Sequence, residues 1–245
     1  MPIHRHFRLL ALSLSLTLFL AAGLTLTGCN SGTGGAGAED PRNIQDSIHA
    51  FLTPDLIDSL KKYGMTINEG SNPPNVEGFY FANSQKRKGS NVPNDNTTTF
   101  HSMSIKLSGQ TADQRINLDY DQVVEKGSGS GAFITGSGNL FTLYVPIKAR
   151  YIARGDTVDY ETAVCYSGRV DSEGIHEFIN GLVVTKKDPD TLGIVLKVGE
   201  GRVIEEGDTL AAKVTDYPHV VVVTPGLKAK IAATLGAGGT SGAGN

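Results

Sequence analysis

Residues 140–167 read LFTLYVPIKARYIARGDTVDYETAVCYS, and this stretch predicts two antiparallel strands. Apolar and polar side chains alternate on both sides of the Arg154-Gly155-Asp156 turn, as they do in strands with one buried face. A parallel sheet covered on both faces would show unbroken apolar runs instead. The residues that we expect on the buried faces are Phe141, Leu143, Val145 and Ile147 before the turn, and Val158, Tyr160, Thr162, Val164 and Tyr166 after it.

The same period of two extends from this hairpin in both directions along the chain. Short connections rich in Gly, Asp, Asn and Ser separate the segments. Sequential hairpins form a meander, and a long meander must close or fold over, because otherwise two sheet edges stay exposed. We therefore predict an all-β domain, with an up-and-down β-barrel as the first choice and a two-sheet sandwich as the second. The predicted strands are 76–83, 98–108, 115–124, 131–135, 140–149, 157–167, 175–185, 192–198 and 210–214.

The segment before the strands has the period of a helix. Apolar residues recur three or four positions apart between residues 43 and 65. Thr53 is a favourable N-cap, Pro54 suits the first helical position, and Gly64 is a typical helix stop. We predict two short helices hinged at Thr53, in a helical segment at 41–75 that precedes a β-barrel domain at 76–225.

The first 28 residues are typical of a secretory signal. Arg5 and Arg8 precede the apolar run 9–24, which is shorter than the ~20 residues that a spanning helix needs. A small residue, Gly28, stands directly before Cys29. We predict a signal peptide at 1–28, since cleavage after residue 28 fits better than an uncleaved signal anchor.

The tetrad Leu26-Thr27-Gly28-Cys29 resembles the lipobox of bacterial lipoproteins. The resemblance implies a diacylglycerol on the Cys29 sulfur and a further acyl chain, such as palmitate, on its freed amine. Several chains anchor a protein durably, since each buried methylene contributes about 0.8 kcal/mol. In that family an Asp after the cysteine favours retention at the inner membrane, and Asn30 stands here. The resemblance thus implies a lipid anchor in the outer membrane of a Gram-negative cell, and it leaves the leaflet open.

The composition indicates the character of the two terminal segments and the net charge of the mature chain. Gly, Ser, Thr and Ala predominate near both ends, so we predict a flexible tether at 29–40 and a disordered tail at 226–245. Removal of the signal takes two of the 22 basic residues and leaves 20 against 25 acidic ones, a net charge of −5. That balance, without any long run of Lys and Arg, argues against nucleic-acid binding.

The sequence contains no set of residues that points to an enzyme, a metal or a cofactor. The segment Gly127-Ser128-Gly129-Ser130-Gly131 has glycine where a Gly-x-Ser-x-Gly elbow needs serine, so we predict a hairpin turn there. His176-Glu177 lacks the second histidine of a zinc-protease helix. Lys187-Asp188-Pro189-Asp190 is typical of a turn, and a Ca²⁺ loop starting there would lack its twelfth-position Glu.

Three further features have simple structural interpretations. Cys165 lies within an apolar strand pattern, and with Cys29 lipidated it has no disulfide partner, so we expect a buried small hydrophobe. Lys86-Arg87-Lys88 is the only basic cluster, and we expect a solvated loop, with contact to anionic headgroups as the alternative. Asn96-Thr97-Thr98 matches the glycosylation acceptor, a frequent chance match.

The stretch Gly78-Phe79-Tyr80, after a short helix and before a meander, resembles the opening of lipocalin-like barrels, with Tyr80 where lipocalins have Trp. Residues 72–78 and 91–95 are also similar to segments of lipocalin-like lipoproteins of Bacteroidota-type bacteria. This resemblance implies a fold and leaves the function open.

Two functions follow from such a barrel. Its interior binds one small hydrophobic molecule, or it is packed shut and the protein is a structural or protein-interaction module of the cell envelope. Bulky inward side chains decide between them, because they determine whether space remains. The candidates are Phe79, Phe133, Phe141, Tyr160, Tyr166 and Phe178.

Overall fold

The computed structural model describes residues 41–217. The predicted signal peptide at 1–28, the lipidation site Cys29, the tether at 29–40 and the tail at 226–245 lie outside this part. The helices are α1 (Pro41–His49) and α2 (Pro54–Lys62). The strands are β1 (Ser71–Asn72), β2 (Gly78–Ala82), β3 (Gln85–Ser90), β4 (Met103–Ser108), β5 (Arg115–Gln122), β6 (Glu125–Ser137), β7 (Leu140–Ala153), β8 (Asp156–Val170), β9 (Gly174–Lys187), β10 (Gly201–Glu206) and β11 (Leu210–Val214).

The two helices form as the sequence predicts, with the hinge at Thr53. The Leu56 amide donates to Thr53 Oγ1 at 3.4 Å, and Pro54 opens α2. Gly64 has a φ of +98° after the last turn, a conformation that glycine adopts without strain. Neither helix between residues 41 and 217 is long and apolar enough to span a membrane.

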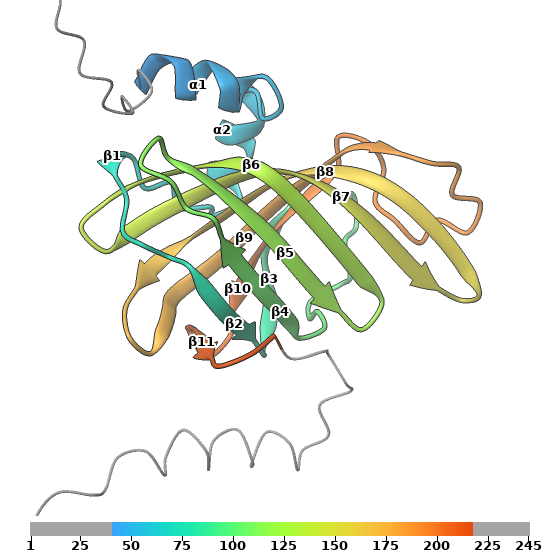
Figure 1. The fold of residues 1–245 in the computed structure, drawn as a ribbon. Helices are drawn as coiled ribbons and strands as arrows, with labels where there is room; N and C mark the ends of the chain where they lie inside the picture. The colour runs from blue at the N-terminus through green and yellow to red at the C-terminus, as the bar shows by residue number, and fades with distance from the viewer. Residues whose placement is uncertain (1–40, 218–245) are drawn as a thin grey trace, which may run out of the picture. The chain divides into compact units, whose positions relative to one another are not determined.

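Eight strands form a closed, antiparallel ring. Hydrogen bonds run in the order β2, β4, β5, β6, β7, β8, β9 and β11, and β11 returns to β2. All eleven described strands belong to this one sheet, and only the short β1 pairs in parallel, with β6. Figure 1 shows α1 and α2 on the outside of the ring, and α2 packs against β9 and β10. The prediction of mostly antiparallel β structure after two short helices is confirmed.

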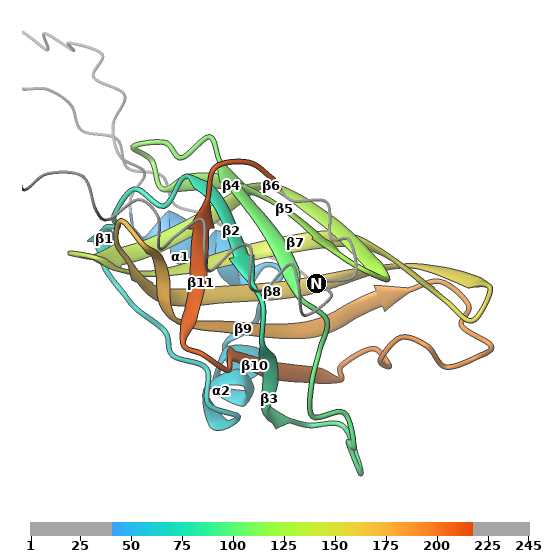
Figure 2. The same cartoon turned by 90° about the horizontal axis from the view of Figure 1, so that it is seen from below.

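Strands β3 and β10 extend the ring at one end and were not predicted. β3 continues β2 and β10 precedes β11, so that both pairs behave as single bent strands (Figure 2). The prediction that Lys86-Arg87-Lys88 lie in a loop is wrong, since they belong to β3. Lys88 Nζ lies 3.1 Å from a carboxylate oxygen of Glu205 on β10, so the charged side chains of the two strands pair on the outer face.

The predicted strand at 192–198 is also wrong. The amides of Ile194 and Val195 donate to the Asp190 carboxylate at 2.9 and 3.0 Å, which holds this segment as a loop. The strand follows instead at Gly201–Glu206, where Arg202, Glu205 and Glu206 obscure the apolar alternation. A side chain that satisfies backbone amides in this way competes with strand pairing.

The glycines from 127 to 131 do not form the predicted hairpin turn. They lie inside β6, which runs from Glu125 to Ser137. A Cβ on Gly127 would lie 2.3 Å from Cε1 of Tyr120, and one on Gly129 would lie 2.4 Å from Cγ1 of Val145. Glycine is therefore required here because side chains of neighbouring strands occupy the space inside the ring.

Apolar side chains form one core inside the ring and a second one under the helices. Ile48, Leu52 and Leu60 pack on the outer face, where Cys165 is fully buried. The prediction that Cys165 is a buried small hydrophobe is confirmed. Burial also raises the pKa of its thiol, so the thiolate needed for nucleophilic chemistry is disfavoured.

Two of the six aromatic residues expected to point inward point outward. Phe133 packs in the core under the helices, with the Arg115 guanidinium 4.0 Å from its ring centre. Phe79 pairs with Tyr217 at 6.2 Å between ring centres, because the alternation in β2 places Tyr80 inside. The four that face the interior core are Phe141, Tyr160, Tyr166 and Phe178.

Candidate functional site

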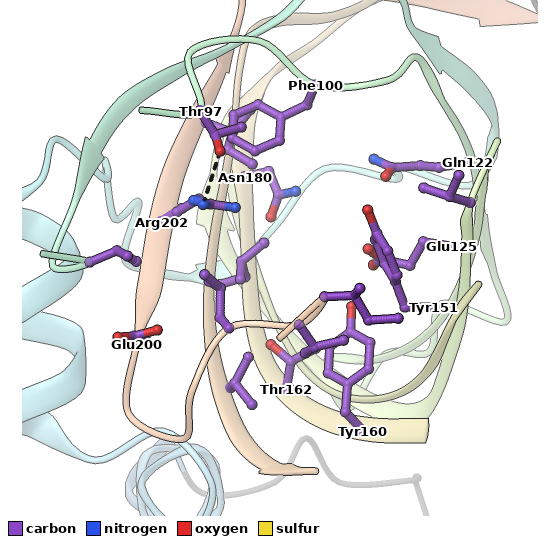
Figure 3. A pocket seen from close by; sticks show the side chains of 18 of the residues that line it. Thr97, Phe100, Gln122, Glu125, Tyr151, Tyr160, Thr162, Asn180, Glu200 and Arg202 are labelled. Atoms are coloured by element: carbon purple, nitrogen blue, oxygen red, sulfur yellow. Dashed lines mark hydrogen bonds between the residues drawn. The ribbon is translucent and has the colours of Figure 1, made fainter. Parts of the chain in front are cut away.

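A cavity of about 830 Å³ occupies one end of the ring. Its wall comes from inward residues of β4, β5, β8, β9 and β10, together with Glu125 and Tyr151, and the loops 91–102 and 188–200 frame its mouth (Figure 3). The apolar part of the lining includes Met103, Val164, Leu182, Val184, Leu196 and Ile204. We call this region the open end of the ring.

A carboxyl group surrounded by tyrosines lies on one side of the cavity. The Tyr120 hydroxyl donates a short hydrogen bond to Glu125 Oε1, and Tyr160 forms a second hydrogen bond with the same carboxyl group. Burial raises the pKa of Glu125, although both hydrogen bonds act in the opposite direction. The Glu125 charge also contributes to the raised pKa of Tyr151 and of Tyr166, which places both near the carboxylate. We call these five residues the carboxyl–tyrosine cluster.

The β9 side of the cavity carries a buried amide. Asn180 is only 5% exposed, and its Oδ1 has no hydrogen-bond partner. Its neighbour in the lining, Thr162, is satisfied, because its hydroxyl donates to the Val183 carbonyl at 2.9 Å. A buried acceptor without a partner costs roughly 1–3 kcal/mol, which favours a donor supplied from within the cavity.

Charged pairs hold the loops at the mouth. Arg202 on β10 donates to both carboxylate oxygens of Asp95, at 2.9 and 3.0 Å, and to Thr97 Oγ1 at 3.3 Å. Although burial opposes ionisation, these bonds lower the pKa of Asp95 to about 2. On the facing loop, Lys187 donates to Asp190 at 2.9 Å and lowers the pKa of its carboxyl group to about 2. Two of the three Lys and Arg side chains in the lining, Arg202 and Lys187, are therefore neutralised by the protein itself, and the third is Lys197.

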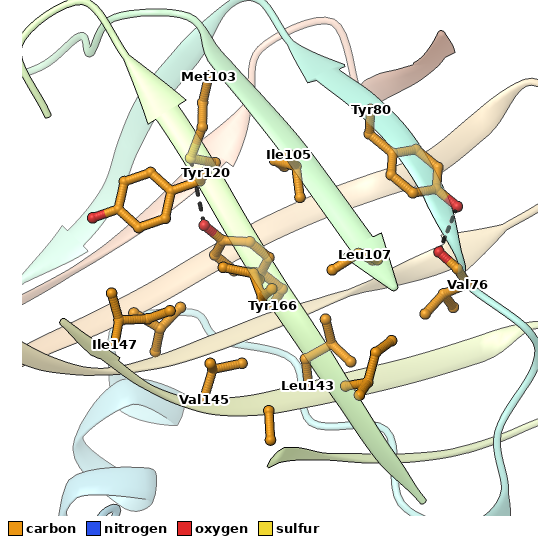
Figure 4. Close-up of a cluster of buried hydrophobic side chains, with 14 of the residues drawn as sticks. Val76, Tyr80, Met103, Ile105, Leu107, Tyr120, Leu143, Val145, Ile147 and Tyr166 are labelled. Carbon is orange, nitrogen blue, oxygen red and sulfur yellow. Dashed lines mark hydrogen bonds between the residues drawn. The ribbon is translucent and has the colours of Figure 1, made fainter. Parts of the chain in front are cut away.

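The other end of the ring is filled by side chains. Val76, Tyr80, Leu107 and Leu143 meet there, each of them at most 2% exposed (Figure 4). The Tyr80 hydroxyl donates to the Val76 carbonyl at 2.8 Å, which ties the chain before β2 across this end. We call this region the closed end, and the cavity of about 830 Å³ lies at the open end.

His176 lies apart from the cavity, at the turn between β8 and β9. Its Nε2 is 3.0 Å from one Asp171 oxygen and 3.7 Å from Glu173, so three possible ligand atoms gather there. Asp171 also accepts a hydrogen bond from the Arg169 guanidinium at 3.2 Å and one from the Glu173 amide at 2.9 Å. These contacts account for the cluster, and a neighbouring guanidinium disfavours a metal cation.

The sequence pattern placed Tyr160 and Thr162 inward but missed two other polar residues of the cavity, Glu125 and Asn180. Thr97, from the Asn96-Thr97-Thr98 match, lines the mouth, and Tyr160 was expected to point inward. Asn180 could have been identified from the sequence, because it is a polar residue within the inward-facing series Phe178, Leu182 and Val184. Glu125 could not have been identified in this way, because it begins β6 directly after a turn, where the alternation of the sequence does not show which face a side chain takes.

We compared the chain with protein-family models, with curated proteins and with solved structures, and found no match in any of the three.

Proposed function

We propose that this protein binds one small, largely apolar molecule inside a lipocalin-like β-barrel formed by the eight-stranded ring. The observation that carries the proposal is the cavity of about 830 Å³ at the open end, which lies within the range of about 300–1,000 Å³ typical of ligand sites. Eight strands enclose an interior wide enough for one small ligand. The buried, unpartnered oxygen of Asn180 in its wall supports a bound molecule and not an empty space.

The arrangement favours binding over catalysis. Ligand sites are lined mainly by apolar and aromatic side chains with a few polar groups that orient the ligand. This cavity combines aliphatic residues on β8, β9 and β10 and four tyrosines with a larger share of polar and charged side chains, most of them near the mouth loops. We therefore propose a binding protein that is not an enzyme and needs no cofactor.

Dye displacement combined with thermal unfolding tests the proposal. A panel of small apolar molecules should displace an environment-sensitive dye, and a ligand at 100 times its Kd should add about 2.7 kcal/mol of stability. Leu182→Trp places an indole in the cavity and should abolish binding, whereas Ile152→Trp adds the same group at a position that is 54% exposed. Binding that survives Leu182→Trp unchanged would contradict the proposed site.

We further propose that Cys29 carries lipid and holds the domain at the outer membrane of a Gram-negative cell. The support is the lipobox-like tetrad at 26–29 after a short apolar run. Cys29→Ser should leave a soluble or unprocessed precursor, judged by fractionation and mass. A variant that is cleaved and stays with membranes after salt and carbonate washing would show that the anchor lies elsewhere.

A packed interaction module is the alternative function, and the closed end favours it. Phe141 and Phe178 are each at most 1% exposed and fill part of the interior. If nothing displaces the dye and nothing raises the melting temperature, the loops that frame the mouth become the expected site of a protein partner.

A further inference from the structure

Of the three carboxyl groups in the cavity lining, that of Asp190 pairs with Lys187, whereas those of Glu125 and Glu200 form no ion pair among the described residues. Arg202 is bound to Asp95, and Lys187 is bound to Asp190. Among the described residues Glu125 forms no ion pair, and its partners are the hydroxyls of Tyr120 and Tyr160. An ionised carboxyl group held away from water without an opposite charge is costly, and a ligand cation offsets that cost.

The side chains around this carboxyl group also suit a cation. Tyr151 and Tyr160 lie beside Glu125 in the cavity wall (Figure 3), and Tyr120 binds its carboxylate. The faces of aromatic rings carry negative partial charge and attract ammonium groups, by about 0.5–1 kcal/mol at exposed sites and about 2 or more when desolvated. An anionic head beside Glu125 would instead be repelled by its carboxylate.

The buried amide oxygen agrees with the same kind of ligand. Asn180 Oδ1 is an acceptor without a donor, and an ionised Glu125 is likewise an acceptor. Both open positions in the wall therefore call for N–H or O–H groups from the ligand. An ammonium group supplies three donors and a positive charge, whereas a carboxylate supplies neither.

Resting on the proposed binding function, we propose that the ligand is an amphiphilic amine whose ammonium group binds Glu125 within the carboxyl–tyrosine cluster. Its apolar portion lies against Val164, Leu182 and Val184, which line the same cavity. The protein thereby selects a head group by charge and tolerates variation in the apolar portion, because the aliphatic wall makes no directed bonds.

Titration calorimetry with hexylamine, hexanol and hexanoate on the purified full chain tests this inference. The three probes share one chain and differ only in the head group, and we expect hexylamine to bind most tightly, by at least about tenfold. Glu125→Gln keeps the length and an acceptor for Tyr120 but removes the charge, so it should lower hexylamine affinity by about tenfold or more and leave hexanol unchanged. Glu161→Gln is the matched control, because Glu161 pairs with Lys186 at 3.3 Å and does not line the cavity.

The possible outcomes distinguish a failure of the amine inference from a failure of the proposed binding function. Equal binding of hexylamine and hexanol, or an equal effect of Glu125→Gln on both, would overturn the amine inference and leave the binding function standing. Tightest binding of hexanoate would also overturn the inference. Absence of binding by all three probes, together with no dye binding, would overturn the binding function itself.

Discussion

The two ends of the ring are built from the same strands and differ in what their inward side chains do. At the closed end, Tyr80 and Leu143 are fully buried, and the one hydroxyl is satisfied by the Val76 carbonyl. At the open end, Glu125 and Asn180 face a cavity of about 830 Å³, and the Asn180 oxygen has no partner. The difference indicates that the closed end stabilises the fold, whereas the open end is shaped to bind.

The largest difference is expected from truncating one phenylalanine at each end. Phe141→Ala removes a fully buried ring at the closed end and should lower the free energy of unfolding by about 3–5 kcal/mol. Phe100→Ala removes a half-buried ring at the mouth and should cost about 1 kcal/mol. Denaturant unfolding measures both, and equal losses would contradict the division of the ring into two ends.

A buried acid at the end of β10 makes stability depend on pH. Glu206 pairs in register with Gln85, and Glu206 Oε2 and Gln85 Oε1 both lack partners. Burial raises the pKa of Glu206 to about 8 from its usual value near 4.5, so the native state holds a proton that the unfolded state releases. This contribution to stability is present below about pH 4.5 and is lost as the pH rises to about 8, with a slope of at most about 1.4 kcal/mol per pH unit.

Glu206→Gln should weaken this pH dependence, because glutamine does not titrate. Chemical unfolding at several pH values between 4.5 and 8 provides the measurement. Parallel pH profiles for the original chain and the variant would show that another group causes the fall.

A methyl group added at Gly127 in β6 should displace Tyr120 and so disturb the open end of the ring. The added carbon would lie 2.3 Å from the Tyr120 ring, and Tyr120 holds Glu125. We expect Gly127→Ala to cost about 1–3 kcal/mol by overpacking and to weaken amine binding. Ser128→Ala on the exposed side of the same strand should stay within about 0.5 kcal/mol, and a similar cost for both variants would contradict this explanation.

The smallest expected difference in stability is between two variants that each lose one tyrosine hydroxyl. Tyr80→Phe leaves the buried Val76 carbonyl without its partner and should cost about 1 kcal/mol at the closed end. Tyr151→Phe at the open end should change stability by less than about 0.5 kcal/mol, because its hydroxyl faces the cavity. Thermal and denaturant unfolding of both variants provide the comparison, and a larger loss for Tyr151→Phe would reverse it.

Period-two patterns predicted the strands that close the ring, and they failed where charge or glycine hides the alternation. β3 begins Gln85-Lys86-Arg87-Lys88, and β6 begins with an acid and several glycines, so neither shows an apolar face in the sequence. The segment 192–198 has apolar residues, yet Asp190 binds its amides and keeps it in a loop. β3 depends on pairing with β10, which is distant in the sequence, β6 depends on pairing with β5, and the segment 192–198 depends on a side chain that binds backbone amides.

The sequence by itself determined two short helices, an antiparallel sheet after them, and the faces of strands such as 157–167, whose alternation is a local property of the backbone. Only the tertiary structure decided that one end of the ring is packed and the other hollow. It also decided that Glu125 meets tyrosines from β5, β7 and β8, three other strands of the ring. The physical reason is that strand tilt and register determine which residues lie at the same height along the axis of the ring. Register in turn arises from pairing between strands distant in the chain.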